Sequence, residues 1–453
     1  MNGNDLVTKF VTETTWDKLP SQVQHTSRLA LLDTLGAALV GTLTPISQIT
    51  AEYASGRWPG DEATILLHGR RASAAGAAFA NGYSANAIDI DDCGLYTKGH
   101  PGVQVVPTAL ALAEARGMSG ATMLTGVVVG YEVSHRAARI WHATHDTYQA
   151  CGSWGSVACA AIAAHLMGLD KEQTGHALGI ADYHAPNLPM MRDIDHPAMV
   201  KHGIGWGAMN GIISAELAAQ GFTGIPSIFG FADFDGWIAD IGEHYTVVDG
   251  LAWKRYACCA WDHAAILGAD RLMKTHSFGA EHVTHVRVET FHEALRLGVS
   301  LPTTTEEAQF NLAWPLAAYI VDGEIGPNQI LERALTREDI RDLAKRIEVV
   351  ETEELNELYR LACQGDPQGK YASKVIIELS DGRTVETGLV EGEINFPQET
   401  WDEEGLEEKF RWLTSGLPAS HVLDKDRVDE LVDMVWEFEN VSDVHELTRL
   451  VAG

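Results

Sequence analysis

The chain has 453 residues, 45% of them hydrophobic and 21% charged, the composition of a globular protein long enough for two or three domains with a large buried core. Its 33 basic and 63 acidic residues give a formal net charge of −30, which argues against nucleic acid or an anionic membrane as the main partner. The six cysteines are too sparse for a disulfide scaffold, and neither a signal-peptide pattern nor an apolar run of about 18 residues is present. We therefore expect a soluble cytoplasmic protein. A small anionic ligand remains compatible with this charge, because a few basic side chains suffice for a local positive pocket.

Helical patterns dominate the first 268 residues. Apolar residues recur at helical spacing over residues 4–55, and the pattern continues over 72–88 and 107–140 with many alanines and glycines. Small residues let helices approach one another closely. We therefore expect a tightly packed all-helical core in this part of the chain rather than a sheet.

Residues 81–107 connect two of these apolar helices and gather groups that can carry acid–base chemistry. Their polar side chains include Asp89, Asp91, Asp92, Cys93, Lys98 and His100. A carboxylate beside an imidazole is the minimal set for proton transfer, and loops carried by rigid helices often hold catalytic groups. The alternative is a solvated loop whose aspartates cap a helix.

Two further polar clusters precede small-residue helices. His142, His145, Asp146 and Tyr148 come before the turn CGSWGS, and their spacing alone is equally typical of a polar loop. Lys201 stands near the start of the apolar helix that follows MVKHG. The helix dipole disfavours a lysine at that end, which indicates a functional role for it.

The pattern changes between residues 269 and 398. Alternation predicts strands at 283–290 and 347–352, and the stretches 371–379 and 384–390 flank an Asp-Gly turn as in a β-hairpin. Helices are expected at 304–323 and 337–346, and the chain becomes helical again from residue 399. We therefore predict a mainly α protein, in which a large discontinuous helical domain of residues 1–268 and 399–453 carries an inserted smaller α+β domain of residues 269–398.

Motifs for metal or nucleotide chemistry are missing where their context requires them. No G-x-S-x-G elbow, P-loop, dinucleotide-binding glycine fingerprint or H-E-x-x-H stands at a suitable place, and the adjacent Cys258 and Cys259 suit no zinc knuckle. We therefore expect acid–base chemistry with no metal and no organic cofactor.

Six segments in this order resemble the MmgE/PrpD family. They are NGYSANAIDIDD followed by HPG, then VVPTALALAEA, CGSWGSVACAA, MVKHG, KRYACCAWDHAA and AQFNLAWPLAAYIVDG. Members of this family include dehydratases, decarboxylases and epimerases of small carboxylates. The resemblance implies a discontinuous helical domain, an inserted α+β domain with the active site between the two, a homodimer, and no cofactor.

The resemblance also implies site residues. Asp89, His100 and Lys201 fall on the catalytic positions of the family, and Lys254 falls on its second lysine. This sequence departs from the family at Cys93, where threonine is common, at Arg255, at Trp314, and at HDTYQ, where His145, Asp146 or Tyr148 must replace a histidine. The predicted catalytic residues are Asp89, His100, Tyr148 and Lys201. The predicted substrate-binding residues are Tyr83, Asp92, Cys93, His145, Lys254 and Arg255.

The reactions of the family share the movement of a proton at a carbon next to a carboxylate. Cationic groups in a water-poor cleft stabilise the enediolate-like intermediate, a role we assign to Lys201 and Lys254, with Arg255 as a further candidate. His100, oriented by Asp89 or Asp92, is the predicted acid or base. The leading hypothesis is a dehydratase or decarboxylase of a small di- or tricarboxylate.

Two other hypotheses remain open. An epimerase of a dicarboxylate such as iminodisuccinate would need two acid–base groups on opposite faces of the carbon, for which Tyr148 and Lys201 are candidates. A non-catalytic binding protein for anionic metabolites would exchange no proton. Proton exchange into the substrate would separate these hypotheses.

Overall fold

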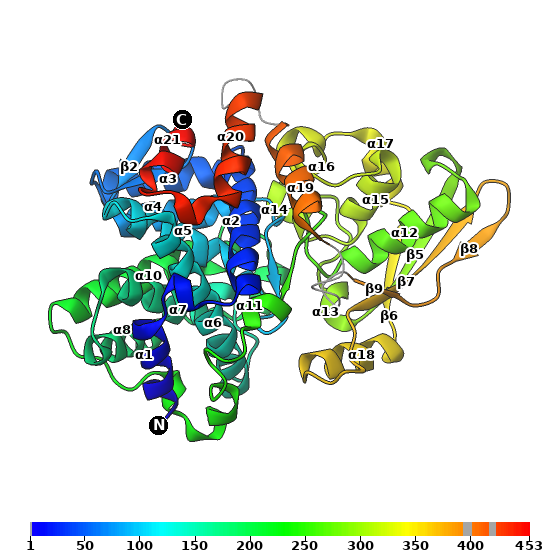
Figure 1. Cartoon of the computed structure of the whole chain (residues 1–453). Coiled ribbons are helices and arrows are strands. Elements are labelled where there is room, and N and C mark those ends of the chain that lie inside the picture. Colours follow the sequence, from blue (N-terminus) through cyan, green and yellow to red (C-terminus); the bar gives the residue numbers. More distant parts are fainter. Residues whose placement is uncertain (1, 393–400, 416–422) are drawn as a thin grey trace.

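The computed structural model describes residues 2–392, 401–415 and 423–453, and its architecture is mainly α with small sheets (Figure 1). The helices of the first part gather on one side of the molecule, and the largest sheet lies on the other. Helices of the first part are α1 (Gly3–Glu13), α2 (Ser21–Gly41), α3 (Pro45–Arg57), α4 (Ala74–Ala85), α5 (Gly102–Ala115), α6 (Gly120–Thr144), α7 (Cys151–Met167), α8 (Lys171–Tyr183), α9 (Met190–Asp195), α10 (Ile204–Ala219) and α11 (Thr246–Asp249). The predicted fold class is confirmed.

Small residues bring the central helices together. Helix α10 packs on α7, α4 and α8, and α7 also packs on α6 and α5. At Gly211 of α10, an added Cβ would lie 2.4 Å from the Cβ of Cys159 on α7, so a larger residue would force these helices apart. The expectation of a close-packed helical core is therefore confirmed in this part of the chain.

The helical pattern expected over residues 107–140 forms two helices. Helix α5 already begins at Gly102 and ends at Ala115. Gly117, at a φ of 59°, lies in the turn that follows it. Ser119 then caps α6 by accepting from the backbone N–H of Thr122. The turn folds α6 back along α5, and the two helices pack against each other.

A five-stranded mixed sheet lies between residues 283 and 391. Its strands are β5 (Val283–Thr290), β6 (Ile347–Glu351), β7 (Ala372–Leu379), β8 (Thr384–Glu386) and β9 (Val390–Glu391). The order is β6-β5-β7-β8 with β9 also paired to β7, and β5 with β6 is parallel whereas the other pairs are antiparallel. Val286 and Val288 face the core in the predicted period of two, and the predicted strand at 283–290 is confirmed.

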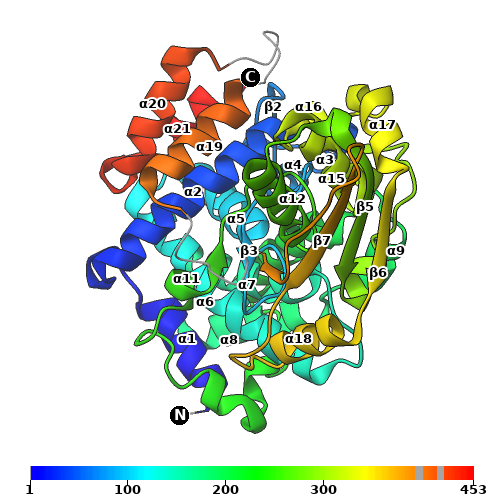
Figure 2. The same ribbon diagram turned by 90° about the vertical axis from the view of Figure 1, so that its right-hand side faces the viewer.

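Helices flank this sheet, as Figure 2 shows for α12 and α18. The helices of this part of the chain are α12 (His263–His276), α13 (His292–Leu295), α14 (Thr305–Gln309), α15 (Ala313–Asp322), α16 (Pro327–Ile330), α17 (Glu338–Ala344) and α18 (Glu353–Cys363). The single helix expected at 304–323 is interrupted, because the Asn311 side chain accepts from the backbone N–H groups of Ala313 and Trp314 and starts α15 anew. Helix α18 was not predicted. Leu355, Leu358 and Ala362 recur in it at helical spacing and pack on the core, so the apolar period was present in the sequence.

The C-terminal helices return to the first part of the chain (Figures 1 and 2). They are α19 (Glu403–Ser415), α20 (Lys425–Trp436) and α21 (His445–Leu450), and both α19 and α20 pack on α2. Lys409 of α19 pairs with the buried Asp33 of α2, and Arg28 pairs with Glu439. The predicted return of the chain end is confirmed, whereas the predicted boundary at residue 398 lies outside the described residues.

Two short antiparallel sheets complete the first part. They are the hairpin of β1 (Ala63–Ile65) with β2 (Arg70–Ala72), and the pair of β3 (Cys93–Gly94) with β4 (Leu251–Ala252), which are distant in the chain. Across the described ranges no single helix is long and apolar enough to cross a bilayer. Helices α2 and α3 meet that length and composition criterion only as a pair, across a bend of 94°.

Candidate active site

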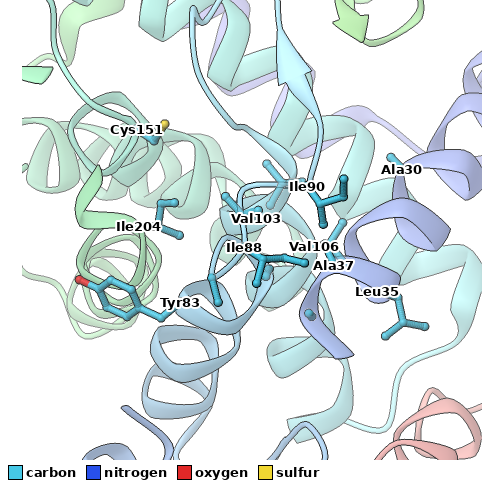
Figure 3. Close-up of a cluster of buried hydrophobic side chains, with 14 of the residues drawn as sticks. Ala30, Leu35, Ala37, Tyr83, Ile88, Ile90, Val103, Val106, Cys151 and Ile204 are labelled. Carbon is cyan, nitrogen blue, oxygen red and sulfur yellow. The ribbon is translucent and has the colours of Figure 1, made fainter. Parts of the chain in front are cut away.

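The loop between α4 and α5 is held in place by its own apolar residues. Ile88 and Ile90 are fully buried and lie in the cluster with Val103 and Val106 of α5 and Ala37 of α2 (Figure 3). Asp89 between them has a φ of 53°, a left-handed conformation that non-glycine residues adopt at a cost. Burial of its two neighbours holds this conformation.

Asp89 forms the anionic centre of the site. It is fully buried, its Oδ2 accepts from the Lys254 ammonium at 2.7 Å, and its Oδ1 lies 3.4 Å from His100 Nε2. Burial alone would raise the pKa of this carboxyl, but Lys254 and His100 hold it well below its usual range. The same pairing raises the pKa of Lys254 against the opposing effect of burial. Asp89 and Lys254 are therefore an ion pair at neutral pH.

His100 is held by acceptors on both sides of its ring. Its Nδ1 donates to the Asp92 carbonyl at 2.8 Å and lies 3.0 Å from Asp91 Oδ2, while its Nε2 faces Asp89. Burial lowers the pKa of this imidazole, but the carboxylates of Asp91 and Asp89 outweigh burial and raise it. The geometry thus favours a cationic imidazolium that can contact a substrate carboxylate.

Asp92 holds the loop in place through two hydrogen bonds to its side chain. Its Oδ2 accepts from the Tyr131 hydroxyl at 2.8 Å, and its Oδ1 accepts from the backbone N–H of Gly102 at 3.0 Å. A Cβ at Gly102 would meet Asp92 Oδ1 at 2.9 Å and the Tyr131 hydroxyl at 2.6 Å, so this approach requires glycine. Burial and the neighbouring carboxylates of Asp91 and Asp33 raise the pKa of Asp92 to about 7. Its side chain therefore positions the His100 turn.

We expect Asp92→Asn to gain stability relative to the wild type as the pH rises from 5 to 7. The carboxyl is harder to ionise in the folded state than in the unfolded chain, so its ionisation favours unfolding between the unfolded pKa of about 4 and the folded pKa of about 7. The neutral amide lacks this effect. Urea titrations at both pH values measure it, and an equal stability difference at pH 5 and pH 7 would contradict it.

Lys201 enters the site from a strained turn, η2 (Lys201–Gly203), that leads into α10. Lys201, His202 and Gly203 have φ values of 35°, 58° and 67°, three left-handed residues in succession. The buried ammonium donates to Gln309 Oε1 at 2.8 Å and lies 4.9 Å from the centre of the Phe310 ring. Burial lowers the pKa of Lys201, opposed by Asp89 and Glu306. The interruption after α14 thus places Gln309 and Phe310 against Lys201.

His202 and Asp193 belong to the same cluster and were not among the predicted site residues. His202 Nδ1 and its backbone N–H both donate to Asp193 Oδ2 at 2.8 Å, and the His202 ring stacks on His100 with centroids 5.6 Å apart. His202 follows Lys201 directly in MVKHG. That adjacency was the available signal, but helical periodicity would have turned the two side chains to different sides.

A small cavity of about 40 Å³ adjoins these groups. Its lining includes Cys93, His100 and Tyr148 from the first part of the chain and Trp261, Phe310 and Tyr371 from the second. A water molecule needs roughly 10–15 Å³, so the cavity has room for a few waters, and a tricarboxylate requires the lining to move apart. Burial raises the pKa of Cys93 to about 12, so this residue is a neutral thiol in the lining.

The other predicted site residues lie at different distances from this centre. Tyr148 lines the cavity, and its hydroxyl donates to the Lys98 carbonyl. Tyr83 is buried beside Phe79 and α10, and burial raises the pKa of its phenol. His145 does not line this cavity; its ring stacks on Trp141 and Nδ1 contacts the Trp141 carbonyl. The Arg255 side chain also points away from this cavity.

Arg255 is exposed and lies over the Trp401 ring at 5.2 Å, where it lines a separate cavity of about 410 Å³. The adjacent Lys254 points inward to Asp89, so these two neighbouring side chains face opposite sides of the segment. The predictions placed both side chains at the substrate. The structure brings Lys254 to the site and directs Arg255 away from it.

Asp89, His100 and His202 could in principle bind a metal, because one ligand atom from each lies within 4.8 Å of the others. The residues around them disfavour a cation. The Lys254 ammonium already neutralises Asp89, and Lys201 adds a second positive group to the same cluster. The donor set therefore fits an anionic ligand better than a divalent metal.

Comparison with known proteins gives matches over nearly the whole chain. Residues 6–244 match the MmgE/PrpD N-terminal domain, and residues 256–437 match the MmgE/PrpD C-terminal domain. The chain is 26% identical to the cis-aconitate decarboxylase-like protein oryM of Aspergillus oryzae, over 98% of this chain and 96% of that protein. It is also 26% identical to human cis-aconitate decarboxylase, over 96% and 91%, and 24% identical to the Aspergillus terreus enzyme, over 96% and 93%. The chain belongs to the MmgE/PrpD family.

Proposed function

We propose that this protein is a lyase that decarboxylates a small tricarboxylate of the cis-aconitate type. The observation that carries the proposal is the convergence of Lys254, Lys201 and His100 on one buried cluster beside a cavity. Such cationic groups suit a substrate that carries several carboxylates. The names of the relatives support decarboxylation as the reaction.

The chemistry required of the site follows from such a substrate. The departing carboxyl is attached to a methylene that is joined to a carbon–carbon double bond. When its bond breaks, carbon dioxide leaves and the electron pair forms a new double bond. The former π pair moves to the far carbon, which bears another carboxylate. The resulting enediolate needs nearby positive charge and then one proton.

The residues of the cluster suit these two needs. The Lys201 ammonium and the His100 imidazolium can contact the carboxylates, and Lys254 keeps Asp89 ionised and fixed so that Asp89 holds His100. A cavity of only about 40 Å³ strengthens each of these interactions, because a few enclosed waters screen their electrostatic attraction less than bulk water does.

Dehydration of a related hydroxy acid would use the same groups, and it is the neighbouring reaction within the proposed lyase class. An epimerase needs a second acid–base group on the opposite face of the carbon. The Tyr148 hydroxyl, the candidate for that role, donates to the Lys98 carbonyl and would first have to leave it. This contact favours the lyase over the epimerase.

The test is proton NMR in D2O of the purified protein with cis-aconitate, citrate, 2-methylcitrate and iminodisuccinate, after treatment with a chelator. We expect an unsaturated dicarboxylate to appear from cis-aconitate with deuterium at the carbon that accepted the proton. Alkene formation from a hydroxy acid instead would support a dehydratase. Deuterium exchange with loss of optical purity would support an epimerase. Tight binding without any change in the spectrum of the ligand would support a binding protein.

We also propose that the protein forms a homodimer through the face of α3 and α10. Tyr53 and Trp206 are about half exposed, at 48% and 47%, and the Trp58 ring contacts both of them. Ile49 and Ile213 extend this surface by one and two helical turns. Large exposed apolar surfaces mark association sites in soluble proteins.

Trp206→Glu is therefore expected to convert the dimer to monomers, because a charge in the buried centre of the contact would lose its water without a partner. Light scattering coupled to gel filtration measures the mass. Leu389→Glu is the control, because it also replaces an exposed apolar side chain by a carboxylate but lies near the sheet, away from this surface. A monomeric wild type, or a dimeric Trp206→Glu variant, would contradict this interface.

A further inference from the structure

The two stacked histidines of the site differ in what their second ring nitrogen contacts. Both ring nitrogens of His100 face acceptors, Nδ1 toward Asp92 and Asp91 and Nε2 toward Asp89. His202 is 2% exposed, and within the described part of the chain its Nε2 has no hydrogen-bond partner. An unpartnered ring nitrogen inside an active-site cluster is available for proton transfer.

Asp193 determines which nitrogen of His202 is available. Its Oδ2 accepts from both the backbone N–H and Nδ1 of His202, so Nδ1 carries a hydrogen and Nε2 is left as the titrating position. Although burial raises the pKa of Asp193, His202 lowers it by more, so this acceptor is ionised. A carboxylate that orients an imidazole in this way also stabilises the imidazolium once it takes up a proton.

The position of His202 relative to the other groups is well defined. Its ring lies parallel to His100, at an angle of 3°, and its other neighbour is the edge of Phe310 at 5.4 Å and 88°. Phe310 also contacts the Lys201 ammonium and lines the cavity. His100 and Phe310, which both line the cavity, therefore connect it to His202 and Lys201, which lie directly behind them.

We propose that His202 is the acid that protonates the substrate carbon, and that Asp193 is its positioning residue. The inference rests on the proposed decarboxylation. In the step, the pair of electrons left on the far carbon forms a new C–H bond with the proton of the His202 Nε2–H. The Nε2–H bond breaks, its electrons stay on the nitrogen, and the neutral imidazole regains a proton from water before the next turnover. His100 then serves as a cationic contact for a carboxylate.

Charged groups from four elements face His202. Asp193 of α9 and Asp89 of the loop after α4 bring negative charge close to it. His100, from the turn before α5, and the neighbouring Lys201 of η2 bring positive charge. An anionic substrate bound in this cluster adds negative charge, which compensates the charge of the protonated His202 that the proposed step requires.

The test compares His202→Asn with His196→Asn, an exposed histidine of the same segment. Asparagine suits the left-handed backbone at position 202 and can still donate to Asp193, so the variant is expected to fold. We expect kcat to fall about 10²- to 10⁴-fold, as for loss of a general acid, with KM within about threefold. The His196→Asn variant is expected to match the wild type.

A second readout separates proton donation from a structural role. In D2O the wild type is expected to place deuterium on one face of the carbon, because one fixed acid delivers it. Product from His202→Asn is expected to carry deuterium on both faces, since water then supplies it. Near-wild-type kcat with one-sided deuteration in His202→Asn would overturn the inference. If the wild type releases no carbon dioxide from any tricarboxylate, it is the proposed function that fails.

Asp193→Asn provides the independent check if His202→Asn does not fold. An asparagine at 193 no longer stabilises the imidazolium, so we expect about tenfold lower kcat and an alkaline limb of the pH–rate profile moved to lower pH. A profile identical to that of the wild type would refute the positioning role of Asp193 and, with it, the assignment of His202.

Discussion

Lys201→Met is expected to lower kcat about 10³-fold or more, equivalent to about 4 kcal/mol of transition-state stabilisation, while the protein stays folded. The Lys201 ammonium is 1% exposed and is aimed by Gln309 and Phe310 at the cluster that contains Asp89. Methionine keeps the length and packing of the side chain and removes its charge. The loss therefore reports the charge itself rather than a cavity.

The measurement is kcat for decarboxylation of the substrate found by NMR, with circular dichroism and mass in solution as checks of folding. Lys274→Met is the matched control, because Lys274 is 76% exposed and pairs with Asp270 outside the cluster. A Lys201→Met variant with a rate near that of the wild type would remove Lys201 from the mechanism.

Lys254→Met is expected to destabilise the fold by about 3–5 kcal/mol, because it leaves the carboxylate of Asp89 buried without its partner. Asp89→Asn is expected to destabilise it by a similar mechanism, since Lys254 then loses its own counter-ion. The double variant Lys254→Met/Asp89→Asn is expected to recover most of the stability and none of the activity. Neutral neighbours of similar volume can replace a buried ion pair, but they cannot hold His100 as a cation.

Urea titration of the wild type and the three variants gives the four unfolding free energies of this double-mutant cycle. The change of stability with pH is a second test of the pair. Burial raises the pKa of Asp89, and Lys254 opposes it more than any other group does. We therefore expect this pKa to lie above that of the unfolded chain in Lys254→Met, so that the variant loses stability as the pH rises from about 4. In the wild type the pair is ionised throughout that range. Additive single-variant losses in the double variant would show that the two groups do not act as a pair.

Position along the chain explains which of these features could be placed from the sequence. Asp89 and His100 lie in one connection, and any fold that pairs helices α4 and α5 keeps them near each other. The strand at 283–290 was equally predictable, because alternating burial is a local property of extended chain. Family resemblance then pointed to Lys201 and Lys254, which no local pattern would have joined to Asp89.

Side-chain direction was the part that sequence patterns could not give. Lys254 and Arg255 are adjacent, but one meets Asp89 and the other lies over Trp401. His202 would point away from Lys201 in a regular helix, whereas three left-handed residues turn both side chains into the same cluster. Such a conformation is held by contacts made elsewhere in the chain, including Asp193 and Phe310.

The sequence by itself therefore determined the fold class and the family, because composition, period and motif order are properties of the chain. The tertiary structure decided which charges are paired, which histidine keeps a nitrogen available and how little space the cavity leaves. These depend on contacts between residues as distant as Asp89 and Lys254, 165 positions apart. Burial changes the pKa values of the side chains that make these contacts and strengthens the interactions between them. The packing of the whole molecule sets that burial.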